Sequence, residues 1–175
     1  IGVELRQGFI RGTGSCQVPA SVQRMPMLEN TPLSRWSQQV ADLPRMKYSV
    51  AQWPRSESIY QAFLCLLKQS LQNDRLVATV SSDDVAYAVS YYGIPFGNSP
   101  VWRAKFLTSV LNSSLAMYCF FLTSTRFGID KQIVMPNDLL RLPVRQPSSQ
   151  SECLALIREF DQRAKKGDHD DFETL

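Results

Sequence analysis

Few side chains in this sequence have the types and spacing that catalysis or metal binding requires. The four cysteines, Cys16, Cys65, Cys119 and Cys153, lie tens of residues apart, and no two of them form a C-x-x-C pair. A zinc site needs closely spaced ligands on at least one loop, and His169 is the sole histidine of the sequence. The spacing therefore argues against a metal site and predicts buried, reduced thiols.

Two segments partly match motifs for nucleotide or cofactor binding, but each lacks residues or neighbouring elements that its motif requires. Gly12-Thr13-Gly14 lacks the strand before it and the helix after it that a glycine-rich cofactor loop needs, so it is interpreted as a turn. Asn98-Ser99-Pro100-Val101-Trp102 differs from the Asn-Pro-Pro-aromatic motif of amino-methyltransferases at its second and fourth places, and is interpreted as a loop. The sequence has no P-loop, no G-x-S-x-G and no convincing carboxylate pair. We therefore expect no active site.

The composition of the 175 residues is that of one folded domain without an extreme charge. Hydrophobic residues make up 44% and aromatic residues 10%, which excludes a disordered tail and a disulfide-dense mini-protein. The formal net charge is +3, although residues 1–149 contain 15 basic and nine acidic residues. This local excess fits contact with phosphate but does not require it. Because no signal peptide precedes the chain, we expect a cytoplasmic protein.

The chain divides by composition into residues 1–55, 56–149 and 150–175. The first part has five of the ten prolines, which exclude a long helix or a central strand and predict an irregular segment packed on the rest. In the last part, apolar residues recur at helical spacing and predict a surface helix over about 150–165, followed by a frayed acidic tail. These apolar residues are Cys153, Leu154, Ile157 and Phe160.

The middle part begins with the signals of a small sheet. β-Branched and apolar residues over 75–81 and 85–90 predict two adjacent strands, and the glycines and prolines of 93–100 predict a loop. Residues 59–72 fit either a helix or a buried strand, because periodicity alone does not separate the two for a short apolar run.

A long helix is predicted over 101–124, which contains no Gly and no Pro. The run from Phe106 to Thr123 has no charge and approaches the length of a membrane span. Polar residues interrupt this run, so we expect a central helix in a soluble core and no membrane contact.

One extended pattern runs through this part as short blocks in a fixed order. The blocks are Leu66-Leu67-Lys68-Gln69-Ser70, Arg75-Leu76-Val77-Ala78-Thr79, Asp84-Val85-Ala86-Tyr87, Tyr91-Tyr92-Gly93-Ile94, Ser109-Val110-Leu111-Asn112-Ser113-Ser114-Leu115-Ala116-Met117-Tyr118, Phe121-Leu122-Thr123-Ser124, Phe127-Gly128-Ile129-Asp130-Lys131 and Asp138-Leu139-Leu140-Arg141-Leu142-Pro143-Val144. Over about residues 59–145 the pattern resembles the C-terminal target-recognition region of TaqI-like adenine-specific DNA methyltransferases, which include fused restriction–modification enzymes. In that family a helix with Leu-Asn-Ser and a downstream tyrosine leads to a Trp/Phe-Gly turn, a short strand and an Asp-Leu-Leu-x-Leu-Pro segment.

The resemblance has consequences for the fold and for the function. In such domains the segment that matches Phe63–Ser70 is a strand, which favours the strand over the helix in 59–72. The methyltransferase motifs for S-adenosylmethionine and for the flipped adenine are missing, so the resemblance implies that they belong to the catalytic domain of a longer parent protein. The start at Ile1 without a Met agrees with this expectation. The fragment is then no enzyme and holds no cofactor, and its partners are double-stranded DNA and that catalytic domain.

The candidate DNA contacts are polar side chains at the ends of the expected elements. They are Lys68, Gln69, Arg75, Asn98, Arg126 and Lys131. Long donors at strand ends and in loops reach phosphates and base edges, although solvated strand ends are an equally good interpretation of the first three. For Asn112 and Ser113 we favour a structural role, in which they fix a helix-to-sheet contact.

We therefore expect an α+β fold in which a small mixed sheet packs on a long buried helix, with an irregular N-terminal part and a C-terminal surface helix. A short strand is expected near 132–135 or 142–145. The expected function is sequence-specific DNA recognition within a larger adenine-specific, S-adenosylmethionine-dependent DNA methyltransferase or restriction–modification enzyme. The alternative is a non-catalytic protein–protein interaction module of a multi-subunit bacterial defence complex.

Overall fold

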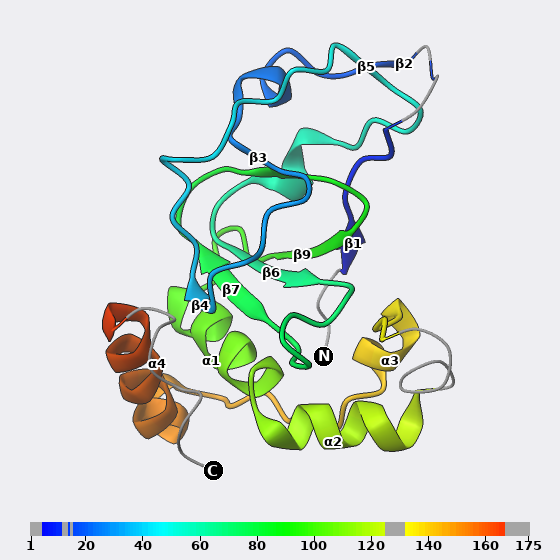
Figure 1. Ribbon diagram of the computed structural model, residues 1–175. Coiled ribbons are helices and arrows are strands. Elements are labelled where there is room, and N and C mark those ends of the chain that lie inside the picture. The colour runs from blue at the N-terminus through cyan, green and yellow to red at the C-terminus, as the bar shows by residue number, and fades with distance from the viewer. Residues whose placement is uncertain (1–4, 12–13, 15, 125–131, 167–175) are drawn as a thin grey trace.

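The computed structural model describes residues 5–11, 14, 16–124 and 132–166, and a five-stranded mixed sheet lies at its centre (Figure 1). The strand order is β1-β9-β6-β7-β4, and neighbouring strands are antiparallel except for β7 and β4. The strands are β1 (Arg6–Gln7), β4 (Trp36–Ser37), β6 (Leu64–Lys68), β7 (Ala78–Ser81) and β9 (Tyr91–Pro95). Helices pack on one face of this sheet, so the fold is α+β, as predicted.

The central strand β6 is buried on both of its faces. Leu64 and Leu66 belong to the core cluster on the side of the N-terminal part, whereas Cys65 and Leu67 belong to the cluster on the side of the helices. A strand covered on both faces has a continuous apolar run in place of alternation, which explains why its sequence also fits a helix. The predicted strand is confirmed, and the helical spacing before it produces only a short 3-10 helix, η2 (Glu57–Tyr60).

The part of the chain before β6 forms a layer of short pieces over the other face of the sheet (Figure 1). Its elements, besides β1, β4 and η2, are β2 (Cys16–Gln17), η1 (Val22–Arg24), β3 (Met27–Leu28) and β5 (Val50–Ala51). This agrees with the irregular structure that the prolines predict. β2 pairs with β5, and β3 pairs in parallel with β8 (Ala86–Tyr87). The prediction that 75–81 and 85–90 form adjacent strands is wrong, because β7 already lies between β6 and β4 and β8 belongs to the N-terminal layer.

The loop predicted over 93–100 begins too early, because residues 93–95 belong to strand β9. Gly93 pairs with Leu66 of β6 and lies against the ring of Tyr87. A Cβ atom at Gly93 would lie 2.1 Å from the Tyr87 hydroxyl oxygen, so this close approach requires glycine inside the strand.

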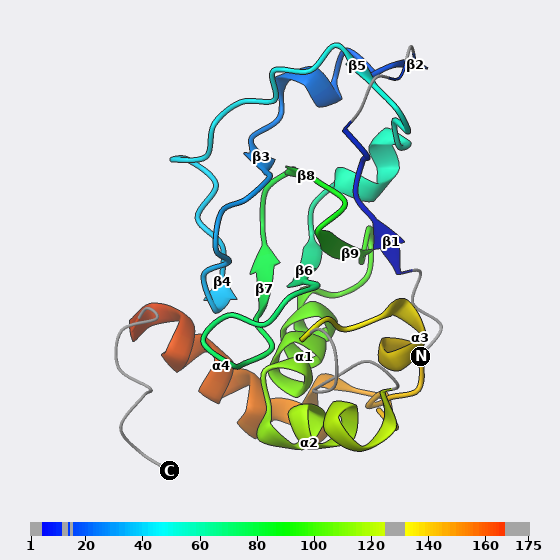
Figure 2. The ribbon, with the colours of Figure 1, turned by 45° about the vertical axis from the view of Figure 1, so that its right-hand side comes forward.

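Two helices, α1 (Val101–Leu111) and α4 (Leu154–Lys166), cover the second face of the sheet (Figure 2). α1 packs on β6 and β7, and α4 packs beside α1 and against β4. α4 follows η3 (Gln150–Cys153) and buries Ile157 and Phe160. The predicted C-terminal surface helix is therefore confirmed.

The prediction of one long buried helix over 101–124 is wrong in its second half. The chain bends by 61° between α1 and α2 (Ser114–Thr123). Only Ala116 and Phe120 of α2 are buried and Met117 is partly buried, whereas four other large apolar side chains are 61–70% exposed. These are Leu115, Tyr118, Phe121 and Leu122. In the described part of the chain, no single helix is long and apolar enough to cross a membrane, and α1 and α2 reach that length only as a bent pair.

The chain from residue 132 lies against the end of the central strand β6 and then forms α3 (Pro136–Leu140). The strand predicted near 132–135 is reduced to one bridge between Ile133 and Ser70, and 142–145 forms no strand. α3 begins with a proline at its first position. Proline suits a helix start because the backbone N–H that it lacks would have no partner within the helix. The Asp138 carboxylate accepts hydrogen bonds from the Met135 N–H at 3.0 Å and from the Ser124 hydroxyl at 2.8 Å.

Candidate functional site

The turn between β6 and β7 carries three of the predicted contact residues at one end of the sheet. Lys68 is the last residue of β6. Across the turn, the backbone N–H groups of Gln72 and Arg75 each donate a hydrogen bond to the backbone carbonyl of the other residue. The Gln69 side chain donates a hydrogen bond to the backbone carbonyl of Val89. Gln69 therefore ties the turn to the segment before β9, which is a structural role, while Lys68 and Arg75 remain candidates for contact with a ligand.

Arg75 lines a cavity of about 340 Å³ where β4, α1, α2 and α4 meet. Two further arginines line the same cavity, Arg35 beside β4 and Arg163 near the end of α4. The other lining residues are Trp36, Ser109, Asn112, Ser113, Ser114, Leu156, Glu159 and Phe160. The fold thus brings Arg75 together with two arginines that lie 40 residues before it and 88 residues after it in the sequence.

The indole ring of Trp36 connects two of these arginines. The guanidinium carbon of Arg35 lies 4.8 Å from the ring centroid, and that of Arg163 lies 5.5 Å from it. Phe160 of α4 packs edge-on against the same ring at 5.8 Å. Trp36 has a φ of 76°, a left-handed conformation that costs about 1–3 kcal/mol for a non-glycine residue and that the surrounding packing must hold in place.

Asn112 closes the floor of the cavity and is committed to the sheet. Its side-chain oxygen accepts the N–H of Ala78 at 2.9 Å, and its side-chain nitrogen donates to the carbonyl of Ala78, also at 2.9 Å. The backbone carbonyl of Asn112 accepts a hydrogen bond of 2.8 Å from Arg35. Ser113 accepts the Ala116 N–H and caps α2. Asn112 therefore makes the expected helix-to-sheet contact, whereas the Ser113 hydroxyl donates to the carbonyl of Val110 and caps α2.

The other predicted contact residues do not join this cavity. Asn98 is exposed in the turn that leads into α1, at the opposite end of that helix from Asn112. Since Leu64 pairs with Pro95 and Lys68 pairs with Tyr91, the length of β6 also separates Asn98 from the Lys68 end of the sheet. Arg126 and Lys131 lie outside the described residues.

The charged side chains that line the cavity, among the described residues, are three arginines and one carboxylate. Among the described residues that line it, Glu159 is the only carboxylate, and its oxygen lies 2.8 Å from a guanidinium nitrogen of Arg163. No group of three His, Cys, Asp or Glu residues that could hold a metal occurs in the described part of the chain. Cys65 lies on the same side of the sheet, but complete burial raises the pKa of its thiol to about 12 and so keeps the thiol protonated.

Sequence reasoning missed Arg35 and Arg163 because no local signal marks them. Arg35 lies among prolines in the irregular part, and Arg163 lies in a helix whose apolar spacing is explained by packing alone. The adjacent Arg35-Trp36 pair is the one feature that could have drawn attention, because arginine and tryptophan are enriched in binding surfaces.

Comparison of the chain with models of known protein families and with curated proteins finds no match. The likeness to the target-recognition region of adenine-specific DNA methyltransferases stays a prediction from the motifs.

Proposed function

We propose that this chain binds double-stranded DNA in the cytoplasm as the target-recognition part of a larger adenine-specific DNA methyltransferase. The observation that carries the proposal is the convergence of Arg35, Arg75 and Arg163 on one cavity at one end of the sheet. Guanidinium groups match phosphate oxygens in charge and in planar geometry, which makes arginine a preferred residue for contacts to the DNA backbone. Such contacts position the duplex, and other residues must read its bases.

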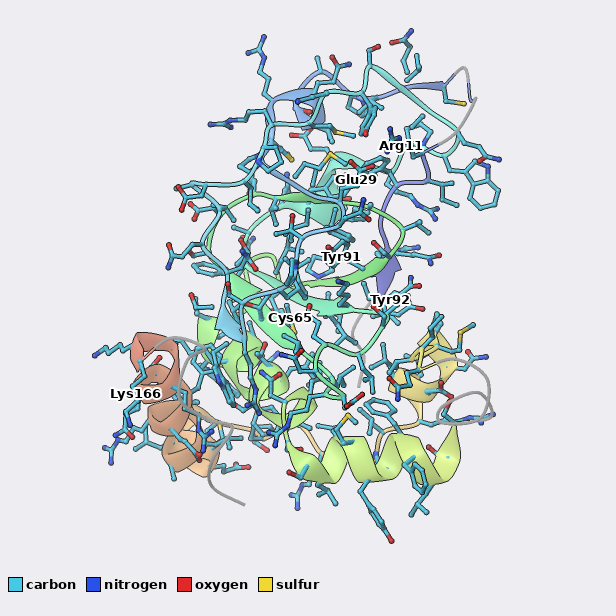
Figure 3. All side chains as sticks on the ribbon, in the orientation of Figure 1. Arg11, Glu29, Cys65, Tyr91, Tyr92 and Lys166 are labelled. Carbon is cyan, nitrogen blue, oxygen red and sulfur yellow. The ribbon has the colours of Figure 1, made fainter. Side chains whose placement is uncertain are left out.

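The surroundings of the cavity support a basic contact surface. The last turn of α4 carries Lys165 and Lys166 in addition to Arg163, and both lysines are exposed. Figure 3 shows Lys166 on α4, far from Arg11 and Glu29 in the N-terminal layer. The catalytic domain of the parent protein would flip the adenine and supply the site for S-adenosylmethionine, and this chain would hold the duplex.

The salt dependence of DNA binding tests the proposal. A closed dumbbell duplex, which has no strand ends, is titrated with the chain at several salt concentrations. We expect Arg75→Ala and Arg163→Ala each to weaken binding and to reduce the slope of log K against log salt by about one unit, because each releases one counterion fewer. Lys47→Ala is the matched control, since Lys47 is exposed in the N-terminal layer and is no part of the cavity wall.

The same titration applies to the predicted contacts outside the described residues. Replacing Arg126 and Lys131 together by Ala should flatten the slope further if the segment between them meets phosphate. Wild-type binding with a slope that neither the arginine variants nor this double variant changes would contradict the proposal.

A second candidate function follows from the exposed apolar side of α2. Leu115, Tyr118, Phe121 and Leu122 are 61–70% exposed, and contiguous exposed apolar surface marks interaction sites. This surface favours a protein–protein contact, which in the proposed parent protein would be with its catalytic domain. Phe121→Glu should then weaken the association of the chain with that domain and leave the salt slope of DNA binding unchanged.

A further inference from the structure

Residue 36 combines a large aromatic side chain with a backbone conformation that favours glycine. The φ angle of Trp36 is 76°, and the N–H of Ser37 donates a hydrogen bond of 3.1 Å to the carbonyl of Arg35. A hydrogen bond between residues i and i+2 around a positive φ defines a γ-turn of the rare and strained kind. Bulky residues in this conformation are outliers, and such outliers cluster at functional sites. The strain at Trp36 therefore points to a role for its ring.

The γ-turn brings the side chain of Arg35 against the ring of the next residue. In an extended strand, successive side chains point to opposite faces of the sheet, so the side chains of neighbouring residues diverge. The turn at Trp36 breaks this alternation, and the guanidinium carbon of Arg35 lies 4.8 Å from the centroid of the indole. The strained backbone is therefore the means by which this pair forms.

Helix α4 brings a second arginine to the same indole. Phe160 and Arg163 lie about one turn apart on this helix, so they share one of its faces. Phe160 packs edge-on against Trp36 at 5.8 Å, and the guanidinium carbon of Arg163 lies 5.5 Å from the ring centroid. Trp36 is buried, and desolvation strengthens the attraction of a ring for a cation. One indole therefore contacts guanidinium groups from two separate elements of the fold.

Each of these two guanidiniums also donates a hydrogen bond to a group in the wall of the cavity. Arg35 donates to the backbone carbonyl of Asn112 at 2.8 Å, and the Nε of Arg163 donates to the Glu159 carboxylate at 3.0 Å. Both arginines make interactions beyond these, so the ring provides part of their restraint and not all of it. A planar ring contact and a directional hydrogen bond together fix the position and the orientation of each guanidinium.

We propose that Trp36 is a positioning residue, which holds the guanidiniums of Arg35 and Arg163 in place on the cavity wall before DNA binds. This role rests on the proposed function for its ligand, the phosphate backbone of a duplex. An arginine that is mobile before binding loses rotamer freedom when it contacts a phosphate, and this loss opposes binding. Where the side chain is already fixed, the loss occurs on folding, and the phosphate contact forms at lower cost.

Stepwise fluorination of the indole tests this role without a large change in its shape. Fluorine withdraws electron density from the ring and so weakens its attraction for a cation, whereas the size of the side chain changes little. Tryptophan analogues with one, two and four fluorine atoms are introduced at position 36 alone, and the dumbbell duplex is titrated with the full chain. We expect the affinity to fall at each step, by about two- to fivefold in all, because partial loss of a cation–π contact changes binding by that order.

Trp102 provides the matched control for this series. The guanidinium carbon of Arg103 lies 5.5 Å from its ring centroid, and neither residue lines the cavity. The same analogues at position 102 should therefore leave the affinity for DNA unchanged. If the ring of Trp36 only packs in the core, fluorination at position 36 also leaves the affinity unchanged, whatever the melting temperature, and this result would overturn the inference.

The mobility of the arginine side chains provides a second measurement, which needs no DNA. Nuclear magnetic resonance relaxation of the Nε–Hε groups should give order parameters of about 0.85 for Arg35 and Arg163, as for rigid backbone, and a lower value for the exposed Arg141. The analogue with four fluorine atoms at position 36 should lower the first two values and leave the third unchanged. Mobility of Arg35 and Arg163 equal to that of Arg141 would overturn the inference.

The two measurements separate this inference from the proposed function. Rigid, fluorine-sensitive arginines in a chain that does not bind the dumbbell duplex would contradict the proposed function alone. Binding of the duplex with an affinity that fluorination at position 36 does not change would contradict this inference alone.

Discussion

The amide side chain of Asn112 links the helical layer to the sheet through two hydrogen bonds to Ala78. It is 6% exposed and satisfies both backbone groups of Ala78 in β7, while its own backbone carbonyl accepts from Arg35. The same residue thus fixes the start of β7, the end of α1 and the position of one arginine of the cavity. Because these hydrogen bonds are buried, loss of the Asn112 side chain would leave both backbone groups of Ala78 without this partner.

Asn112→Ala should lower the free energy of unfolding by about 2–3 kcal/mol, because two buried backbone groups of Ala78 lose their partner. Urea denaturation followed by circular dichroism measures the change. The matched control is Asn98→Ala, which removes the same side chain from an exposed turn and should change the stability by less than about 0.5 kcal/mol. Equal losses in the two variants would show that the Asn112 contact contributes little.

At the scale of elements, the bend between α1 and α2 decides which apolar residues are buried. α1 lies along the sheet, whereas α2 leaves it and is anchored through Ala116 and Phe120. Ser113 caps α2 by accepting the N–H of Ala116, so a new helix begins where the first one ends. A stretch without Gly or Pro therefore produces one buried helix and one half-exposed helix.

Ala116→Asp should destabilise the protein by about 3 kcal/mol or more, since Ala116 is 3% exposed and the new carboxylate would be buried without a partner. Leu115→Asp is its matched control one residue earlier, because Leu115 is 70% exposed and the change should cost less than about 1 kcal/mol. Thermal melts of both variants compare the two positions. Similar melting temperatures for the two variants would contradict the orientation of α2 described above.

At the scale of the whole molecule, the core contains several weakly acidic groups that are buried in their neutral forms. Burial raises the pKa of Tyr91, Tyr92 and Cys65 to about 12, and raises those of Tyr60 and Tyr87 even further. Figure 3 shows Cys65, Tyr91 and Tyr92 at the level of the sheet. Tyr91 belongs to the core cluster on the side of the N-terminal part, and Tyr92 belongs to the cluster on the side of the helices. Each cluster therefore buries at least one phenol in its protonated form.

These raised pKa values predict that the protein loses stability in alkaline solution. The protonated forms favour folding fully below the unfolded pKa values of about 8.5 for Cys and 10 for Tyr, and this contribution is lost as the pH rises toward 12. We expect the free energy of unfolding to fall by about 3 kcal/mol or more between pH 8 and 11, measured by urea denaturation. Cys65→Ala should make the fall between pH 8.5 and 10 shallower, whereas Cys16→Ala at an exposed position should not. A flat profile would contradict the burial of these groups.

The elements that could be predicted from the sequence are those whose signal is local. Three signals determine the structure of the short segments in which they occur. They are the continuous apolar run of β6, the helical spacing of α4 and the prolines of the N-terminal layer. The bend after α1 combines a local signal, the Ser113 cap of α2, with the hydrogen bonds of Asn112 to Ala78, 34 residues earlier in the chain, and the latter cannot be found in the local sequence. The candidate site was predicted only at Arg75, since Arg35 and Arg163 meet it through tertiary packing.

The registers of the two edge strands constrain the order in which the chain can fold during synthesis. Arg6 of β1 pairs with Gly93, and Trp36 of β4 pairs with Thr79. The partner strands of both edge strands are therefore synthesised later than the edge strands themselves. The hairpin of β6 and β7 joins residues close in sequence and has the lowest cost of loop closure. Within this chain, the residues before β6 therefore emerge before their partners, and β1 cannot pair until β9 has emerged.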